Sequence, residues 1–124
     1  MENHDNSPNK RQRQDRDSVL KSIRKMVESE TDKTLLQLKK MYPEDVLFQL
    51  GLKYVTTTKK AYCEAMLIPI EAGCRYKRDL EKSGLLMQSV EDIICPFTKY
   101  PAKEISTNPE EFERLSETNQ LSLF

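Results

Sequence analysis

The sequence predicts a mainly α fold with a small β-hairpin near its C-terminal end. Two observations predict it. Apolar residues recur at spacings of three and four over most of residues 17–82, which is typical of amphipathic helices. Two short strand candidates, LLMQSV (residues 85–90) and KEIST (residues 103–107), then flank the proline-containing turn CPFTKYP. A chain of 124 residues has room for one such domain with tails.

The chain is expected to begin with a disordered polar leader, residues 1–16. This segment has no aliphatic residue after its first, so it cannot bury a core. It carries a small basic arm made of Lys10, Arg11, Arg13 and Arg16. The predicted domain covers residues 17–115, and residues 116–124 are predicted to form a flexible tail.

The first predicted helix begins at Asp17 or Ser18, because either side chain can cap a helix N-terminus. Its apolar residues share one side and are Val19, Leu20, Ile23, Met26 and Val27. Thr31 or Asp32 is expected to cap a second helix that ends near Met41.

A third helix is expected to start with Pro43 in its first position. Proline is tolerated there because the missing N–H has no intrahelical partner in any case. Glu44 and Asp45 follow, where the helix dipole favours negative charge. Gly51 makes the end of this helix uncertain from sequence alone.

Two further helices are expected between residues 57 and 83. Thr57 or Thr58 can cap a short one, which Pro69 must end because proline cannot continue a helical ladder. A longer helix then runs from about Ile70 to Lys82 and stops before Gly84. After the hairpin, NPEEFERL (residues 108–115) predicts a last short helix with an asparagine cap and a proline in its first position.

Composition excludes several functions. Twenty Lys and Arg residues balance twenty Asp and Glu residues, so whole-chain charge favours neither an acidic nor a basic partner. No apolar run approaches the roughly 18 residues of a membrane span, and the N-terminus has no secretory signal, so a cytoplasmic protein is expected.

Chemistry-bearing residues are also sparse. The three cysteines are too widely spaced for a zinc pattern, and His4 is the single histidine. Neither a glycine-rich dinucleotide fingerprint nor a P-loop is present. We therefore expect no enzyme, no metal site and no cofactor, and a binding role instead.

The order of the predicted elements is that of a winged helix-turn-helix. In that fold a short helix, a tight turn and a longer helix precede a hairpin, the second helix enters the DNA major groove, and the hairpin touches the flanking backbone. The predicted helix at residues 70–82 suits this role, because it has an apolar stripe made of Ala72, Tyr76 and Leu80.

A basic stripe lies about 150° from this apolar one at 100° per residue and contains Arg75, Arg78 and Lys82. We add Lys77 as a fourth candidate contact to double-stranded DNA. The alternative interpretation is an ordinary amphipathic helix with a solvated charged side, which Asp79 and Glu81 favour.

The segment TTTKKAYCEAMLIPIEAGCRYKRDLEKSGLL resembles the helix-turn-helix of bacterial winged-helix proteins, which commonly close on R-D-L-x-x-x-G-L. The matching residues are Arg78, Asp79, Leu80, Gly84 and Leu85. The following CPFTKYPAKEISTNPEEF is similar to wing segments of small phage and mobile-element helix-turn-helix proteins. The resemblance covers about residues 44–112 and implies DNA binding.

The last five residues, QLSLF, resemble the pentapeptide with which bacterial proteins bind the replicative sliding clamp. The resemblance implies that Gln120 hydrogen-bonds at the rim of a clamp pocket, while Leu121, Leu123 and Phe124 fill it. A short flexible peptide needs such apolar anchors, because its contact area is small. The alternative is that these side chains cap the core of their own domain.

Together these features predict a DNA-binding adaptor of a bacterial, phage or mobile-element system that docks on the sliding clamp through its tail. The alternative, which the residues leave open, is a protein–protein interaction or oligomerisation module without DNA binding.

Overall fold

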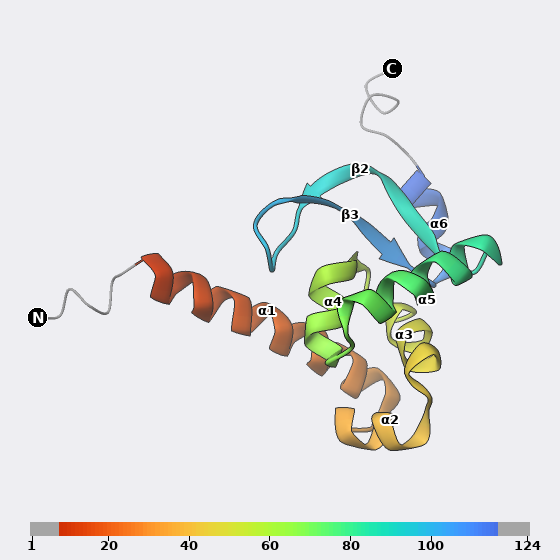
Figure 1. Cartoon of the computed structure of the whole chain (residues 1–124), viewed down its shortest axis with the longest axis horizontal. Helices are drawn as coiled ribbons and strands as arrows, with labels where there is room; N and C mark the ends of the chain where they lie inside the picture. The colour runs from red at the N-terminus through yellow and green to blue at the C-terminus, as the bar shows by residue number, and fades with distance from the viewer. Residues whose placement is uncertain (1–7, 117–124) are drawn as a thin grey trace, which may run out of the picture.

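The computed structural model describes residues 8–116, with the side chains of residues 16–116. In this part of the chain the elements are α1 (Pro8–Thr31), α2 (Leu35–Met41), α3 (Glu44–Leu52), β1 (Thr57–Thr58), α4 (Lys59–Met66), α5 (Ile70–Lys82), β2 (Met87–Ile94), β3 (Pro101–Ser106) and α6 (Pro109–Ser116) (Figure 1). The predicted class, mainly helical with a β-hairpin, is confirmed. Between residues 8 and 116, no helix combines the length and the apolar composition needed to cross a membrane.

Helix α1 begins earlier than expected. It starts at Pro8, so residues 8–16 of the predicted disordered leader are helical. The physical reason is continuity: proline suits the first helical turn, lysine, arginine and glutamine propagate a helix well, and the later turns are held by packing. Ile23 and Val27 are buried there, and Arg24 Nε donates to the carbonyl of Ala65 in α4 at 2.9 Å.

The cap of α2 is Thr34, not Thr31 or Asp32 as expected. Thr34 Oγ1 accepts from the N–H of Gln37, whose side chain accepts from the N–H of Thr34, a complete capping box. Thr31 remains in α1, where its hydroxyl donates to the carbonyl of Val27, and Asp32 ends that helix with a left-handed φ of 58°. Pro43 is likewise the N-cap of α3 rather than its first residue.

The centre of the core is Tyr62, a fully buried residue of α4. Its hydroxyl donates to the carbonyl of Leu47 in α3 at 2.8 Å. Phe48 packs edge-on against its ring at a centroid distance of 5.6 Å and also contacts the ring of Tyr76 in α5 at 5.7 Å. Gly51 faces the same ring, and a Cβ there would overlap the Tyr62 hydroxyl and lie 2.8 Å from Cζ.

The sheet has the order β1–β3–β2 and is antiparallel throughout. The two-residue strand β1 precedes α4 and pairs Thr57 with Ile105 of β3. Strand β2 continues to Ile94, four residues beyond the predicted end. A register shift separates its two paired stretches, and here Ser89 Oγ donates to the carbonyl of Glu91 and accepts from the N–H of Glu104.

The hairpin turn, residues 95–100, is fixed to the helices. Cys95 is buried, and its Sγ lies 2.9 Å from the hydroxyl of Thr58, the N-cap of α4. The N–H of Cys95 donates to the carbonyl of Tyr100 at 2.8 Å, which closes the turn. Phe97 lies beneath the guanidinium of Arg16, 5.9 Å from the ring centroid. The hairpin is therefore attached to both α4 and α1.

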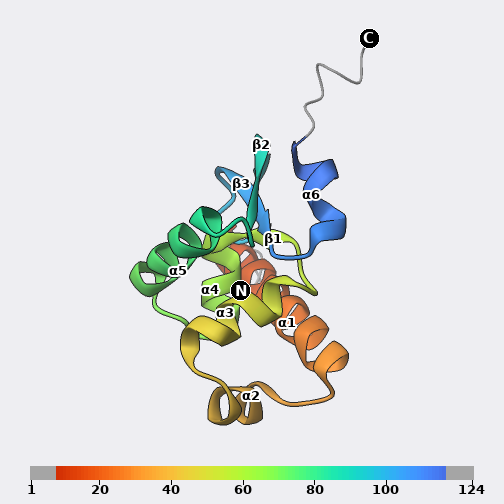
Figure 2. The same ribbon diagram turned by 90° about the vertical axis from the view of Figure 1, so that its right-hand side faces the viewer.

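Helix α6 starts as predicted, with Asn108 accepting from the N–H of Glu110 and Pro109 in the first position. It packs on β2 and β3 through Leu115, which is 2% exposed, and through an ion pair between Arg114 and Glu104 at 3.5 Å. Figure 2 shows α6 on the opposite side of the molecule from α5. The end of the described chain therefore lies away from α5.

Replacing Gly51 by alanine should destabilise the fold by about 1–3 kcal/mol, because the new methyl must displace the buried ring of Tyr62. Urea denaturation measures the loss as a lower free energy of unfolding. Lys53→Ala, at the exposed C-terminal end of the same helix, is the control and should change stability little. Equal stability of Gly51→Ala and the parent would contradict this account of the core.

Candidate nucleic-acid interface

A tight joint connects α4 and α5. Leu67 ends α4 in the left-handed region, with a φ of 58°, although it is not a glycine, and it is 61% exposed. The carbonyl of Leu67 accepts from Lys39 Nζ of α2 at 2.9 Å, and the N–H of Ile68 donates back to Cys63. Pro69 is then the N-cap of α5, so the predicted break in LIPI is confirmed.

Close contact between α4 and α5 depends on Gly73. A Cβ at this position would overlap Sγ of Cys63, so only glycine lets the two helices approach at this point. Burial raises the pKa of the Cys63 thiol to about 12, with a smaller lowering effect from Lys59 and a smaller raising effect from Cys74. This thiol is therefore neutral at physiological pH and serves as a packing group.

The apolar stripe of α5 is seated on the core as predicted. Ala72 is buried, and Tyr76 and Leu80 pack against the core from partly exposed positions. The Tyr76 hydroxyl also donates to Glu44 Oε1 of α3 at 2.7 Å, and this hydrogen bond raises the pKa of the phenol. The rotation of α5 about its own axis is thereby fixed.

This rotation leaves three basic side chains exposed. They form the basic face of α5, defined as Arg75, Arg78 and Lys82. At 100° per residue the three fall within about 60° of one another, and seven residues separate the first from the last, about 10 Å along the axis. Glu71 and Asp79 are exposed on the same helix and reduce its net positive charge.

Lys77 does not belong to the basic face. It lies about 200° from Arg75 around the helix, and its side chain is only 17% exposed. Its ammonium group pairs with Glu81 at 3.2 Å, one turn further along α5. The sequence-based inclusion of Lys77 among the DNA contacts is therefore not supported by its position.

The hairpin adds groups that sequence reasoning did not single out. Lys99 is exposed and has a left-handed φ of 69°, and Tyr100 beside it is exposed as well. Lys103 is committed instead to Asp92 across the ladder at 2.7 Å. A lone lysine in a predicted turn carries no signal of its own, so only the folded hairpin identifies Lys99 as a surface cation near the turn.

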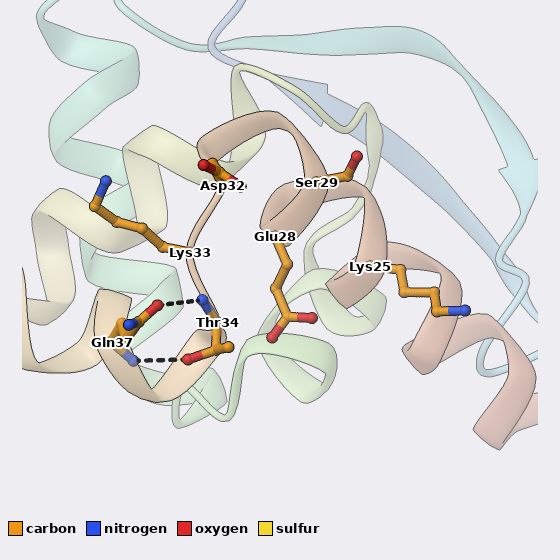
Figure 3. Close-up of a pocket in the computed structure, with 7 residues that line it drawn as sticks. All are labelled: Lys25, Glu28, Ser29, Asp32, Lys33, Thr34 and Gln37. Atoms are coloured by element: carbon orange, nitrogen blue, oxygen red, sulfur yellow. Dashed lines mark hydrogen bonds between the residues drawn. The ribbon is translucent and has the colours of Figure 1, made fainter.

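A shallow groove of about 520 Å³ lies where α1 meets α2 and is shown in Figure 3. Several polar side chains of this groove already form hydrogen bonds with backbone N–H groups. Glu28 accepts from the N–H of Leu35 at 2.7 Å, and Thr34 and Gln37 form the capping box drawn in the figure. Its other charged groups are the side chains of Lys25, Asp32 and Lys33. Among residues 8–116, no cluster of three or more potential metal ligands occurs.

The proposed clamp-binding residues lie outside the described part of the chain. This holds for Gln120, Leu121, Leu123 and Phe124, which follow the end of α6 at Ser116. The choice between a free tail and a tail packed on the core therefore stays a prediction.

Comparisons with protein-family models, with curated proteins and with solved structures found no match for this chain. The functional assignment consequently depends on the residues and on the geometry of α4, α5 and the hairpin.

The buried thiol of Cys63 should make stability fall at alkaline pH. The unfolded chain releases this proton near pH 9, while the folded protein holds it to about pH 12, so the folded state binds more protons between these values. The stability that this thiol contributes is therefore greatest below pH 9, and its loss should lower the free energy of unfolding by about 1.4 kcal/mol between pH 8 and pH 10.

Urea denaturation at a series of pH values measures this decline. Cys63→Ala is expected to lose part of the stability at pH 7 through its smaller side chain, but to show a shallower decline above pH 9. A decline as steep as that of the parent would show that another group is responsible.

Proposed function

We propose that this protein is a DNA-binding adaptor of a bacterial, phage or mobile-element system, built on a winged helix-turn-helix. One observation carries the proposal: the basic face of α5 is exposed on the second helix of a tight helix pair that leads directly into a β-hairpin. In this role α5 enters the major groove of double-stranded DNA and the hairpin lies against the flanking backbone.

The arrangement of elements supports this proposal. The order α3, β1, α4, α5, β2, β3, with the sheet order β1–β3–β2, places one short strand before the helix pair and a hairpin after it. In this role one side of α5 must pack against the core, and its opposite side must be exposed to DNA. The contacts of Ala72, Gly73 and Tyr76 meet the first requirement, and the exposure of Arg75 and Arg78 meets the second.

The charge of α5 sets the expected strength of binding. About 10 Å of helix carries the basic face, a length comparable with three base-pair steps of duplex. Three cations can displace only a few counterions, and Glu71 and Asp79 oppose them. DNA affinity at physiological salt is therefore modest, and a second point of attachment would be needed for stable residence.

The tail supplies that second attachment in the proposal, by docking on the bacterial sliding clamp. Because α6 lies on the opposite side of the molecule from α5, the described chain ends away from α5 (Figure 2). DNA and clamp would then use separate surfaces, and two weak contacts would reinforce one another through a high effective concentration. Such a protein would act in the cytoplasm, where the replicative clamp is found.

A second candidate function is a protein–protein interaction module. It is favoured by exposed apolar side chains near the joint, among them Leu67 and, on α2, Leu36 and Met41. The two functions differ in salt dependence, since only phosphate contacts release condensed counterions.

Single substitutions on α5 test the DNA contact. Arg75→Ala, Arg78→Ala and Lys82→Ala should each weaken duplex binding, and each lost phosphate contact should lower the slope of log affinity against log salt by roughly 0.9. Fluorescence anisotropy with a labelled duplex between 50 and 200 mM salt gives both quantities.

Lys77→Ala is the matched control, because it removes the same charge from the same helix away from the basic face. It should leave affinity and slope close to those of the parent. A triple alanine variant of the basic face that binds as well as the parent would exclude α5 as the DNA contact.

The tail has its own test. Changing Leu123 and Phe124 to alanine should abolish binding to a purified bacterial sliding clamp, because burial of the two side chains is worth on the order of 1.5–3 kcal/mol each. Ser122→Ala, within the same pentapeptide, should still bind.

Thermal unfolding of the same variants distinguishes docking from capping. The melting temperature should stay nearly constant if the tail serves the clamp alone. A drop of several degrees, which corresponds to about 1 kcal/mol for a domain of this size, would identify the tail as part of the core.

A further inference from the structure

We propose that the first turns of α1, residues 8–16, form a second cationic contact that holds the DNA phosphates flanking the stretch met by α5. This inference rests on the proposed function, since it concerns the same DNA complex. It assigns a binding role to a segment that the sequence predicted to be disordered.

The segment differs from the rest of the chain in charge. Its nine residues contain one acidic residue, Asp15, and the four basic residues Lys10, Arg11, Arg13 and Arg16, a net charge of +3 in a chain whose total is zero. The helix runs without interruption from Pro8 onward, so these residues belong to one continuous helical segment.

The segment ends beside the hairpin turn. The guanidinium of Arg16 lies over the ring of Phe97 in the hairpin turn, and that turn is held to the N-terminus of α4 by the contact between Cys95 and Thr58. Figure 1 shows the first turns of α1, drawn in red, extending beyond the hairpin turn and away from the other helices. Nine helical residues add about 13 Å of reach in that direction.

The position fits the flank of a duplex. When α5 lies in the major groove, the hairpin of a winged helix-turn-helix is next to the neighbouring backbone. A helix that continues outward past the hairpin turn therefore meets the phosphates beyond it. Duplex DNA carries one negative charge per 1.7 Å of axis, so 13 Å corresponds to about four base pairs. Such contacts add affinity and orientation without reading sequence.

The experiment compares the full-length parent with Lys10→Gln/Arg11→Gln/Arg13→Gln. Glutamine removes the charges but propagates a helix about as well as lysine, and circular dichroism checks the helix content. The matched control is Lys21→Gln/Lys25→Gln/Lys40→Gln, which removes three charges from exposed lysines further along α1 and on α2. Anisotropy is measured on duplexes of about 12 and 24 base pairs. An α5 contact of about three base pairs leaves about ten base pairs on each side in the longer duplex, but only about four in the shorter one, which the hairpin contact uses.

We call the variant Lys10→Gln/Arg11→Gln/Arg13→Gln the arm variant. We expect only this variant to lose affinity, and mainly on the longer duplex. On this duplex the variant should bind about tenfold or more weakly at moderate salt, with a salt slope reduced by roughly two to three, and the loss should be smaller on the short duplex. The control should stay within about threefold of the parent. Longer DNA offers more binding registers to all proteins alike, so affinity ratios at each length remove that effect.

Two results would overturn the inference while the proposed function stands. One is an arm variant equal to the parent on the longer duplex, in an assay where Arg75→Ala still weakens binding. The other is an equal loss of duplex affinity in the arm variant and the control, which would show that the effect depends only on the net charge of the protein. If the parent itself binds no duplex, the proposed function fails and this inference fails with it.

Discussion

The buried hydroxyl of Tyr62 fixes how α4 packs on α3, and the placement of α5 depends on this packing. It satisfies the carbonyl of Leu47 inside the core, and Gly51 leaves the space that its ring needs. An unpaired buried hydroxyl would cost more than the bond contributes, so α3 and α4 can pack only in the register that makes this bond. Phe48 contacts the rings of both Tyr62 and Tyr76, so the packing of Tyr62 helps to orient α5. The position of the basic face of α5 therefore depends on a contact between α3 and α4.

Much of the helical part could be predicted because its signals are local. Proline, cap residues and apolar spacing act within one or two turns. Accordingly, both ends of α5 and the Asn108 cap were predicted correctly, and Thr58 was one of the two caps expected for α4. The exposure of Arg75, Arg78 and Lys82 also followed from spacing alone, since the opposite stripe is apolar.

The remaining features depend on partners far away in the chain. Strand β1 is two residues long and exists because Ile105 and Glu104 lie beside it, a pairing that no local pattern encodes. Strand β2 continues past its predicted end because Asp92 and Lys103 meet across the ladder. The ion pair of Lys77 could not be predicted for a related reason: the charge of a helical residue does not indicate which neighbour pairs with it, here Glu81.

The end of α3 carries a consequence for the order in which the protein can fold during synthesis. Its last carbonyls, which a helix cannot satisfy itself, accept hydrogen bonds from residues more than 50 positions later: Leu52 from Ser106 and Thr107, and Gln49 from Thr107. A nascent chain emerging N-terminus first therefore exposes five helices before the residues that complete the third one leave the ribosome. The helix pair of α4 and α5 therefore forms before the strand that completes its packing has been synthesised. We expect the folding rate to be limited by bringing together the ends of α3 and β3 rather than by helix formation.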